Sequence, residues 1–273
     1  MTSTRPPFDS NRAWSAASAA LRANREVVLA LAGVFFLLPS LIMALLYPQP
    51  EPIPGADQAA MMAQAQAYYR QTWPIALPLA ALQAAGTLGL LTLLTDRARP
   101  TVAEAIKAGV GALLPYLASQ IIVGMGLGML FLIVVGVSAG IGLPWLAVIV
   151  AVLVGAPIMT RFALTAPVVA IERWRNPLAA LRRAWQLTAG NTWRLLLFFG
   201  LILLAFLIIM SVITGLTGII LALLVPAPVV VIAKALISSA LGAGLVVVLV
   251  ACVAATHAQL AGDRTDSLGA TFE

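Results

Sequence analysis

Long runs of apolar residues constrain this chain more than any other feature. A helix that crosses the hydrocarbon core of a bilayer needs about 20 predominantly apolar residues, and six runs of the sequence meet that requirement with at most one charged residue each. Of the 273 residues, 62% are hydrophobic and 10% are charged, whereas a soluble domain carries roughly 25% charged residues. We therefore predict an all-α polytopic membrane protein with transmembrane helices at residues 27–47, 73–95, 108–141, 143–170, 195–224 and 229–256.

The segment before the first run, residues 1–26, is polar to mixed and carries four arginines. The run itself has 21 residues, more than the roughly 7–15 of a secretory signal, so we expect it to be retained as a helix. Residues 12–25 fit either a helix on the membrane surface or an unstructured tail. We divide the chain into a cytoplasmic segment (1–26), a six-helix transmembrane domain (27–257) and a cytoplasmic tail (258–273).

Short patterns indicate where several helices begin. Thr101 and Glu104 have the spacing of a capping box, in which two side chains satisfy the first free N–H groups of a helix. Asn176 followed by Pro177 is also typical of a helix start. Residues 56–70 read as a short amphipathic helix, separate from the second span. Pro115 is expected to mark the point where an interfacial segment becomes the third span.

Glycines recur at a four-residue spacing in the third run. This spacing places them on one helix face, where small residues let a neighbouring helix approach closely. We favour close helix packing over the alternative, a gating hinge. The two pairs are Gly124 with Gly128 and Gly136 with Gly140.

The most basic stretch, residues 171–194, lies between the fourth and fifth runs. It reads IERWRNPLAALRRAWQLTAGNTWR and carries five arginines against one acid, Glu172. Several larger side chains share one face of the predicted helix, so we expect this helix to lie in the headgroup plane of the membrane. These residues are Leu178, Leu181, Trp185 and Thr188.

The distribution of basic residues predicts an orientation. With a cytoplasmic amino terminus and six spans, 13 basic residues fall on the cytoplasmic side and two, Arg70 and Lys234, on the other. Because cytoplasmic loops carry an excess of Lys and Arg, we expect both termini in the cytoplasm. The net charge of +6 is therefore assigned to topology and lipid headgroups and not to nucleic acid.

The remaining basic residue, Arg161, lies within the fourth run and is the sharpest functional candidate, since a charge at the centre of a span costs about 2.5–3.5 kcal/mol on insertion scales. One interpretation is that it snorkels to the cytoplasmic phosphates or pairs with carbonyls at a helix end. The other is that it lines a headgroup pocket, where Pro157 and Pro167 break the helix. The candidates for headgroup binding are Arg161, Arg173, Arg175, Arg182, Arg183 and Arg194, and the expected interface anchors are Trp73, Trp185 and Trp193.

The sequence offers little for catalysis. It has one cysteine, Cys252, and one histidine, His257, and none of its ten acids is central in an apolar run. Enzymes need positioned acids, bases, nucleophiles or metals. We therefore predict no catalytic residue, no metal site and no cofactor, and we expect His257 to lie at the membrane interface.

A family likeness is carried by residues 161–193. Arg161 and Pro167 are followed by Pro-Leu-x-Ala-Leu-x-x-x-Trp at 177–185 and Leu-Thr-x-Gly-Asn-x-Trp at 187–193. This pattern resembles the core of the glycerophosphoryl diester phosphodiesterase membrane-domain family and the related YciC-like bacterial six-helix membrane proteins. The resemblance covers about 40 residues well and implies a stand-alone membrane domain of a bacterial inner membrane. The catalytic domain found in some members uses paired histidines and a metal, so with one histidine we expect no phosphodiesterase activity here.

These observations predict a non-enzymatic integral membrane protein that binds or organises phospholipids through a basic cytoplasmic face, with a lipid-modifying membrane enzyme as a possible partner. The alternative is a small transporter or permease subunit, favoured by the glycines and prolines within the runs. Weak similarity between three helix-plus-hairpin units also fits a transporter, although chance explains such short matches equally well. Only Gln83, Gln120 and Arg161 are available for a polar pathway.

Overall fold

The computed structural model describes residues 7–50, 53–55, 57–95 and 101–269. Within these residues every regular element is a helix, so the predicted all-α polytopic membrane protein is confirmed. Three arginines of the charge count, at positions 5, 97 and 99, lie outside the described residues, as does the side chain of Arg264. Six segments are long and apolar enough to cross a membrane: Arg25–Leu46, Ala59–Thr95, Val102–Gly140, Trp145–Ala170, Thr192–Leu224 and Pro228–Gly262.

The first span is not one uniform α-helix. It consists of α2 (Arg25–Ala32), a π-helical turn η1 (Gly33–Leu37) and α3 (Leu38–Leu46). The turn ends two residues before Pro39, whose ring crowds the carbonyl four residues earlier and which has no N–H to donate. A wider turn at this point relieves that crowding, and we therefore attribute the irregularity to the proline.

The fourth span also combines a π-helical turn with a proline. Its π-helical turn ends two residues before Pro157. The span begins after a tight turn in which Gly142 has a φ of 76°, a left-handed conformation that glycine adopts without strain. The predicted break between Pro157 and Pro167 is present at Ala163 and Leu164. The elements are α6 (Pro144–Val150), η2 (Ala151–Gly155), α7 (Ala156–Phe162) and α8 (Thr165–Ala170).

Two expected helix boundaries are absent in the second and third spans. The short helix predicted at residues 56–70 is continuous with the second span in α4 (Gln58–Thr95), and Pro115 lies inside the unbroken α5 (Val102–Gly140). Single prolines are tolerated in long membrane helices because neighbouring groups satisfy the freed backbone carbonyls. The predicted capping box is confirmed, since the Glu104 N–H donates to Thr101 Oγ1 at 3.3 Å and the Thr101 N–H to Glu104 Oε2 at 2.8 Å.

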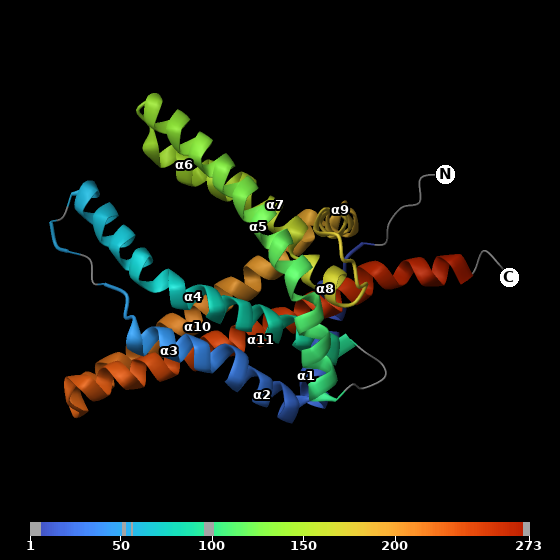
Figure 1. Cartoon of the computed structure of the whole chain (residues 1–273), viewed down its shortest axis with the longest axis horizontal. Coiled ribbons are helices and arrows are strands. Elements are labelled where there is room, and N and C mark those ends of the chain that lie inside the picture. Colours follow the sequence, from blue (N-terminus) through green and yellow to red (C-terminus); the bar gives the residue numbers. More distant parts are fainter. Residues whose placement is uncertain (1–6, 51–52, 56, 96–100, 270–273) are drawn as a thin grey trace.

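The basic stretch forms α9 (Pro177–Thr188), capped as predicted by the Asn176 side chain, which accepts from two backbone N–H groups. Figure 1 shows α9 end-on while the spanning helices run across the view, so α9 lies crosswise to the spans. The last spans are α10 (Thr192–Leu224) and α11 (Ala227–Gly269). The α11 helix continues well beyond residue 256, where we expected the span to end.

The amino-terminal segment contains a helix, α1 (Ser10–Ala23), which decides between the two alternatives for residues 12–25. Its small residues Ala13 and Ala17 are buried and pack in one cluster with residues of α10 and α11. The Phe8 N–H donates to Asn191 Oδ1 at 2.9 Å, and the Phe8 and Phe198 rings lie 5.4 Å apart edge to face. These contacts attach α1 to the transmembrane domain.

Close helix packing occurs at other glycines than the four we predicted. A Cβ on Gly109 of α5 would lie 2.7 Å from the Gly89 backbone nitrogen and 2.8 Å from the Ala85 carbonyl oxygen of α4, so the two backbones nearly touch there. The glycines at positions 124, 128, 136 and 140 have nothing within 4 Å of such a Cβ. The prediction of close packing at these four positions is therefore wrong within the described chain.

Candidate functional site

One acidic side chain, Glu172, joins three separate parts of the fold. Its carboxylate accepts from Arg183 of α9 through Nε at 2.8 Å and through Nη2 at 3.1 Å. Its Oε1 lies 3.0 Å from His257 Nε2 of α11, and its Oε2 accepts from the Trp174 indole N–H at 3.0 Å. We call these four residues the Glu172 cluster. They connect the loop after α8 to α9 and to α11.

The backbone around Arg173 gives the loop its shape. Arg173 has a φ of 57°, the left-handed region that few residues other than glycine adopt. Such a conformation costs of order 1–3 kcal/mol and persists where surrounding contacts stabilise it. The contacts of Glu172 and Trp174, on either side of Arg173, provide that stabilisation. The Asn176 cap then begins α9 and brings Arg183 to the cluster.

The cluster keeps the carboxylate of Glu172 ionised. Partial burial by itself raises the pKa of Glu172, but the hydrogen bonds from His257 and Arg183, together with their charges, outweigh burial. The net result is a pKa of about 2, lowered from 4.5. A carboxylate with so low a pKa is a poor proton acceptor near neutral pH. The arrangement therefore suits a structural connection better than proton transfer.

Arg161 is held by neighbouring side chains from two other helices. Its Nε donates to Thr192 Oγ1 at 3.1 Å, and its guanidinium carbon lies 4.2 Å from the centroid of the Trp185 ring. Its carbonyl accepts from Thr188 Oγ1 at 3.2 Å. A cation over an aromatic face is stabilised by about 0.5–2 kcal/mol. Arg161 therefore packs on α9 and α10.

The five predicted headgroup residues other than Arg161 divide into two groups. Arg183 is taken up by the Glu172 cluster, and Arg175 donates to the Gly111 carbonyl of α5 at 2.7 Å. The other three are exposed and have no hydrogen bond or ion pair to another residue that the structure describes. We call these three the exposed arginines: Arg173, Arg182 and Arg194.

The expected interface anchors are all partly or largely exposed, with exposed fractions of 58% for Trp73, 39% for Trp185 and 65% for Trp193. The residues of the predicted apolar face of α9 differ in how far the chain buries them. Leu181 and Thr188 are buried, but Leu178 is 63% exposed. The buried face is formed mainly by small residues, of which Ala180 and Ala184 are fully buried.

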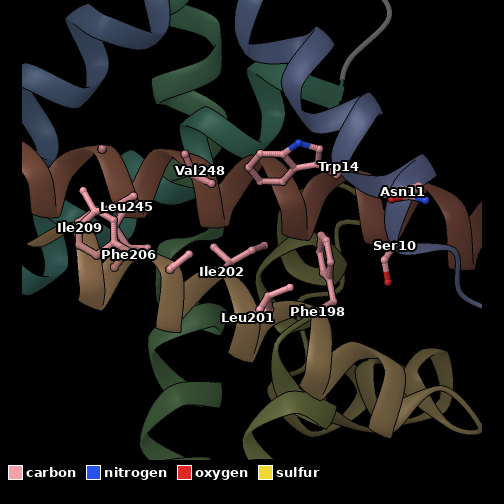
Figure 2. A pocket seen from close by; sticks show the side chains of 12 residues that line it. Ser10, Asn11, Trp14, Phe198, Leu201, Ile202, Phe206, Ile209, Leu245 and Val248 are labelled. Carbon is pink, nitrogen blue, oxygen red and sulfur yellow. The ribbon is translucent and has the colours of Figure 1, made fainter.

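An apolar groove of about 530 Å³ lies between α1, α10 and α11. Figure 2 shows Ser10 and Asn11 at one end and Phe206, Ile209 and Leu245 gathered at the other. Along α10 the lining extends from Phe198 to Ile209, which is about 16 Å at 1.5 Å per residue. The groove therefore has a polar end near the start of α10 and a long apolar remainder.

An exposed arginine, Arg194, lies on α10 just before the first α10 residue of the groove lining. Arg194 precedes Phe198 by four residues and Leu201 by seven, so the three side chains share one face of α10. Helical side chains tilt toward the helix amino terminus, and Arg194 therefore extends away from the apolar part of the groove. A cation, two polar side chains and an apolar groove follow one another in the order of the parts of an anionic phospholipid.

The partners in the Glu172 cluster could not be identified from the sequence. His257 is 5% exposed and lies against a carboxylate that is 85 residues away in the chain. The only sequence feature that pointed to these residues was their rarity: Glu172 is the single acid among the five arginines of residues 171–194, and His257 is the single histidine of the chain. In the part of the chain that the structure describes, no group of three or more metal-binding side chains occurs.

Comparison of the chain with protein-family models, with curated proteins and with solved structures finds no match. The resemblance to the glycerophosphoryl diester phosphodiesterase membrane-domain family therefore stays a prediction.

Proposed function

We propose that this chain is a non-enzymatic membrane protein that binds an anionic phospholipid at its basic face. The observation that carries the proposal is the groove between α1, α10 and α11, together with exposed Arg194, which lies one helical turn before the first α10 residue of its lining. One acyl chain would lie along α10 between Phe198 and Ile209. The phosphate would lie beside the Arg194 guanidinium, which donates in a planar fork that fits phosphate oxygens.

The exposed arginines support the same proposal. Each basic residue near an anionic leaflet contributes about 1 kcal/mol to membrane attraction. The excess of basic residues on this side favours a cytoplasmic location for the Glu172 cluster and both termini. We place the protein in a bacterial inner membrane, in keeping with the resemblance described above.

Filling the groove tests the proposal. Gly244 lines the groove and a Cβ there would meet nothing within 4 Å, so Gly244→Leu should occupy the groove without disturbing the helices. Gly200 of α10 is equally unobstructed and does not line the groove, which makes Gly200→Leu the matched control. Both variants and the wild type would be reconstituted in vesicles of equal phosphatidylglycerol and phosphatidylcholine.

Native mass spectrometry after gentle extraction would count the phospholipids that each chain retains. We expect the wild type to retain phosphatidylglycerol preferentially, Gly244→Leu to lower that retention about tenfold and Gly200→Leu to leave it unchanged. Arg194→Gln should reduce the preference for phosphatidylglycerol about fivefold, because one charge contributes about 1 kcal/mol. Equal retention by the two leucine variants would contradict the proposal.

A further inference from the structure

A second cavity lies at the opposite end of α10 and α11 from the basic stretch. It has a volume of about 1000 Å³, is open to the surroundings and is lined by residues of α3, α4, α10 and α11, together with the chain that follows α3. Unlike the apolar groove, it carries polar side chains from all four helices. The polar residues used below are Ser40, Gln83, Ser211, Thr214, Lys234 and Ser238.

Among the described residues that line this cavity, Lys234 supplies the only charged group. No hydrogen bond or ion pair joins it to any other residue in the described ranges. Its stem packs on α10, where a Cβ at Gly218 would lie 2.7 Å from Lys234 Cε and 3.1 Å from Nζ. The absence of a side chain at Gly218 therefore leaves room for the lysine.

The Lys234 side chain points from α11 toward α10 and not along α11 toward the turn between the two helices. Lys234 lies seven residues after the start of α11, and Gly218 lies six residues before the end of α10. At 1.5 Å per residue the two positions are about 9–10 Å from the turn that joins the helices, so they are at the same level. A lysine that snorkelled would extend toward that turn instead.

This level lies within reach of the far membrane interface. Gly218 follows Arg194 by 24 residues on α10, which is about 36 Å along the helix axis. The hydrocarbon core of a bilayer is about 30 Å thick. If Arg194 lies among the phosphates of one leaflet, then the Lys234 ammonium lies near the phosphates of the other.

We propose that this cavity binds the phosphodiester group of a phospholipid from the leaflet opposite the basic face. One ammonium matches the single negative charge of a phosphodiester, and no carboxylate of a described residue lines the cavity to repel it. Ser40 and Ser211 add hydroxyl groups, and Gln83 Nε2 already donates to Ser40 Oγ at 3.4 Å. Apolar neighbours such as Leu79 and Val231 would contact the glycerol and the first acyl carbons.

This site is distinct from the groove beside Arg194, and its test does not depend on the proposed function. The first variant is Lys234→Gln, which removes the charge. Its matched control is Arg70→Gln, because Arg70 is the other basic residue assigned to that side and does not line the cavity. The second variant is Gly218→Ala, which displaces the flexible end of Lys234. Its control is Gly200→Ala, on the same helix, where a Cβ meets nothing within 4 Å and which does not line the cavity.

The full chain would be reconstituted with phosphatidylglycerol that carries a photoactivatable group on the first carbons of one acyl chain. We expect crosslinks to peptides that contain residues 211–218 and 231–238. Lys234→Gln should lower the yield about tenfold and Gly218→Ala several-fold, while Arg70→Gln, Gly200→Ala and the groove variant Gly244→Leu leave it unchanged. Diacylglycerol with the same photoactivatable group, which lacks phosphate, should give little crosslinking.

Three results would overturn the inference. The first is an equal yield from Lys234→Gln and Arg70→Gln. The second is equal crosslinking by diacylglycerol, which would show that the phosphodiester is not recognised. The third is loss of the crosslink on addition of millimolar inorganic phosphate, which would assign the cavity to a free anion and not to a lipid.

Discussion

Replacing Glu172 with glutamine tests whether the Glu172 cluster connects the loop, α9 and α11. Glutamine has nearly the same shape but no charge, and its amide presents donors where the carboxylate only accepts. The Arg183 side chain, which is 16% exposed, would lose its ionic partner. The His257 and Trp174 nitrogens would then compete for one amide oxygen. We therefore expect Glu172→Gln to loosen the loop and to destabilise the fold.

The size of this loss follows from the pKa of Glu172, which is about 2 instead of 4.5. At about 1.4 kcal/mol per pKa unit, the difference sets an upper bound of roughly 3 kcal/mol on the contribution of the ionised carboxylate. Because 19% of the Glu172 side chain is exposed and water screens such pairs, we expect a loss of about 1–2 kcal/mol.

The pH dependence has a definite sign. Since the pKa of Glu172 is lower in the folded chain than in the unfolded chain, the contribution is complete above about pH 4.5 and disappears as the pH falls toward 2. Unfolding in a mild detergent would be followed by circular dichroism at pH 7 and at about pH 3. The wild type and Glu172→Gln should differ at pH 7 and differ less at pH 3.

The control is Glu26→Gln, which removes the acid in the first turn of α2 and lies outside the cluster. It should change the free energy of unfolding by no more than about 0.5 kcal/mol, as is usual for surface substitutions. If both variants lowered stability equally, or if the loss in Glu172→Gln were the same at pH 3 and pH 7, the reasoning about the cluster would be refuted.

Three further predictions concern helix packing, a helix cap and the arginine of the fourth span. Gly109→Ala should reduce the free energy of unfolding by about 1–3 kcal/mol, because its Cβ meets the α4 backbone. Gly124→Ala should leave the free energy of unfolding unchanged. Denaturant titration of both variants in the same detergent checks this. Thr101→Ala removes a cap and should cost about 1 kcal/mol, with faster amide hydrogen exchange confined to the first turn of α5. Arg161→Gln should lower the unfolding temperature and change the tryptophan emission, because it removes the cation from an indole face, while Arg182→Gln should do neither.

Much of the fold could be predicted because hydrophobicity and helix caps are local properties of the sequence. An apolar run of sufficient length has no stable alternative to a helix in lipid, so the six spans followed directly. The caps at Thr101 and Asn176 each depend on residues within a few positions, and both are present in the structure.

The contacts between distant segments could not be predicted in the same way. The pairing of Glu172 with His257 depends on how α9 and α11 meet, and no pattern within either segment encodes that meeting. The glycines gave a similar difficulty, because Gly109 and Gly124 look alike in the sequence while only Gly109 lies where two backbones cross. The length of α11 was underestimated because polar residues can continue a helix beyond the membrane.

The third and fifth spans bury few of their own side chains. In the most apolar window of the third span 6% of the residues are buried within the chain, and in that of the fifth span none are, against 39% in the second. A water-soluble domain completes its hydrophobic core with its own atoms, but these two helices leave that task to acyl chains. The surrounding bilayer is thus a structural component of this protein, and its thickness and composition will tune how the outer helices are arranged.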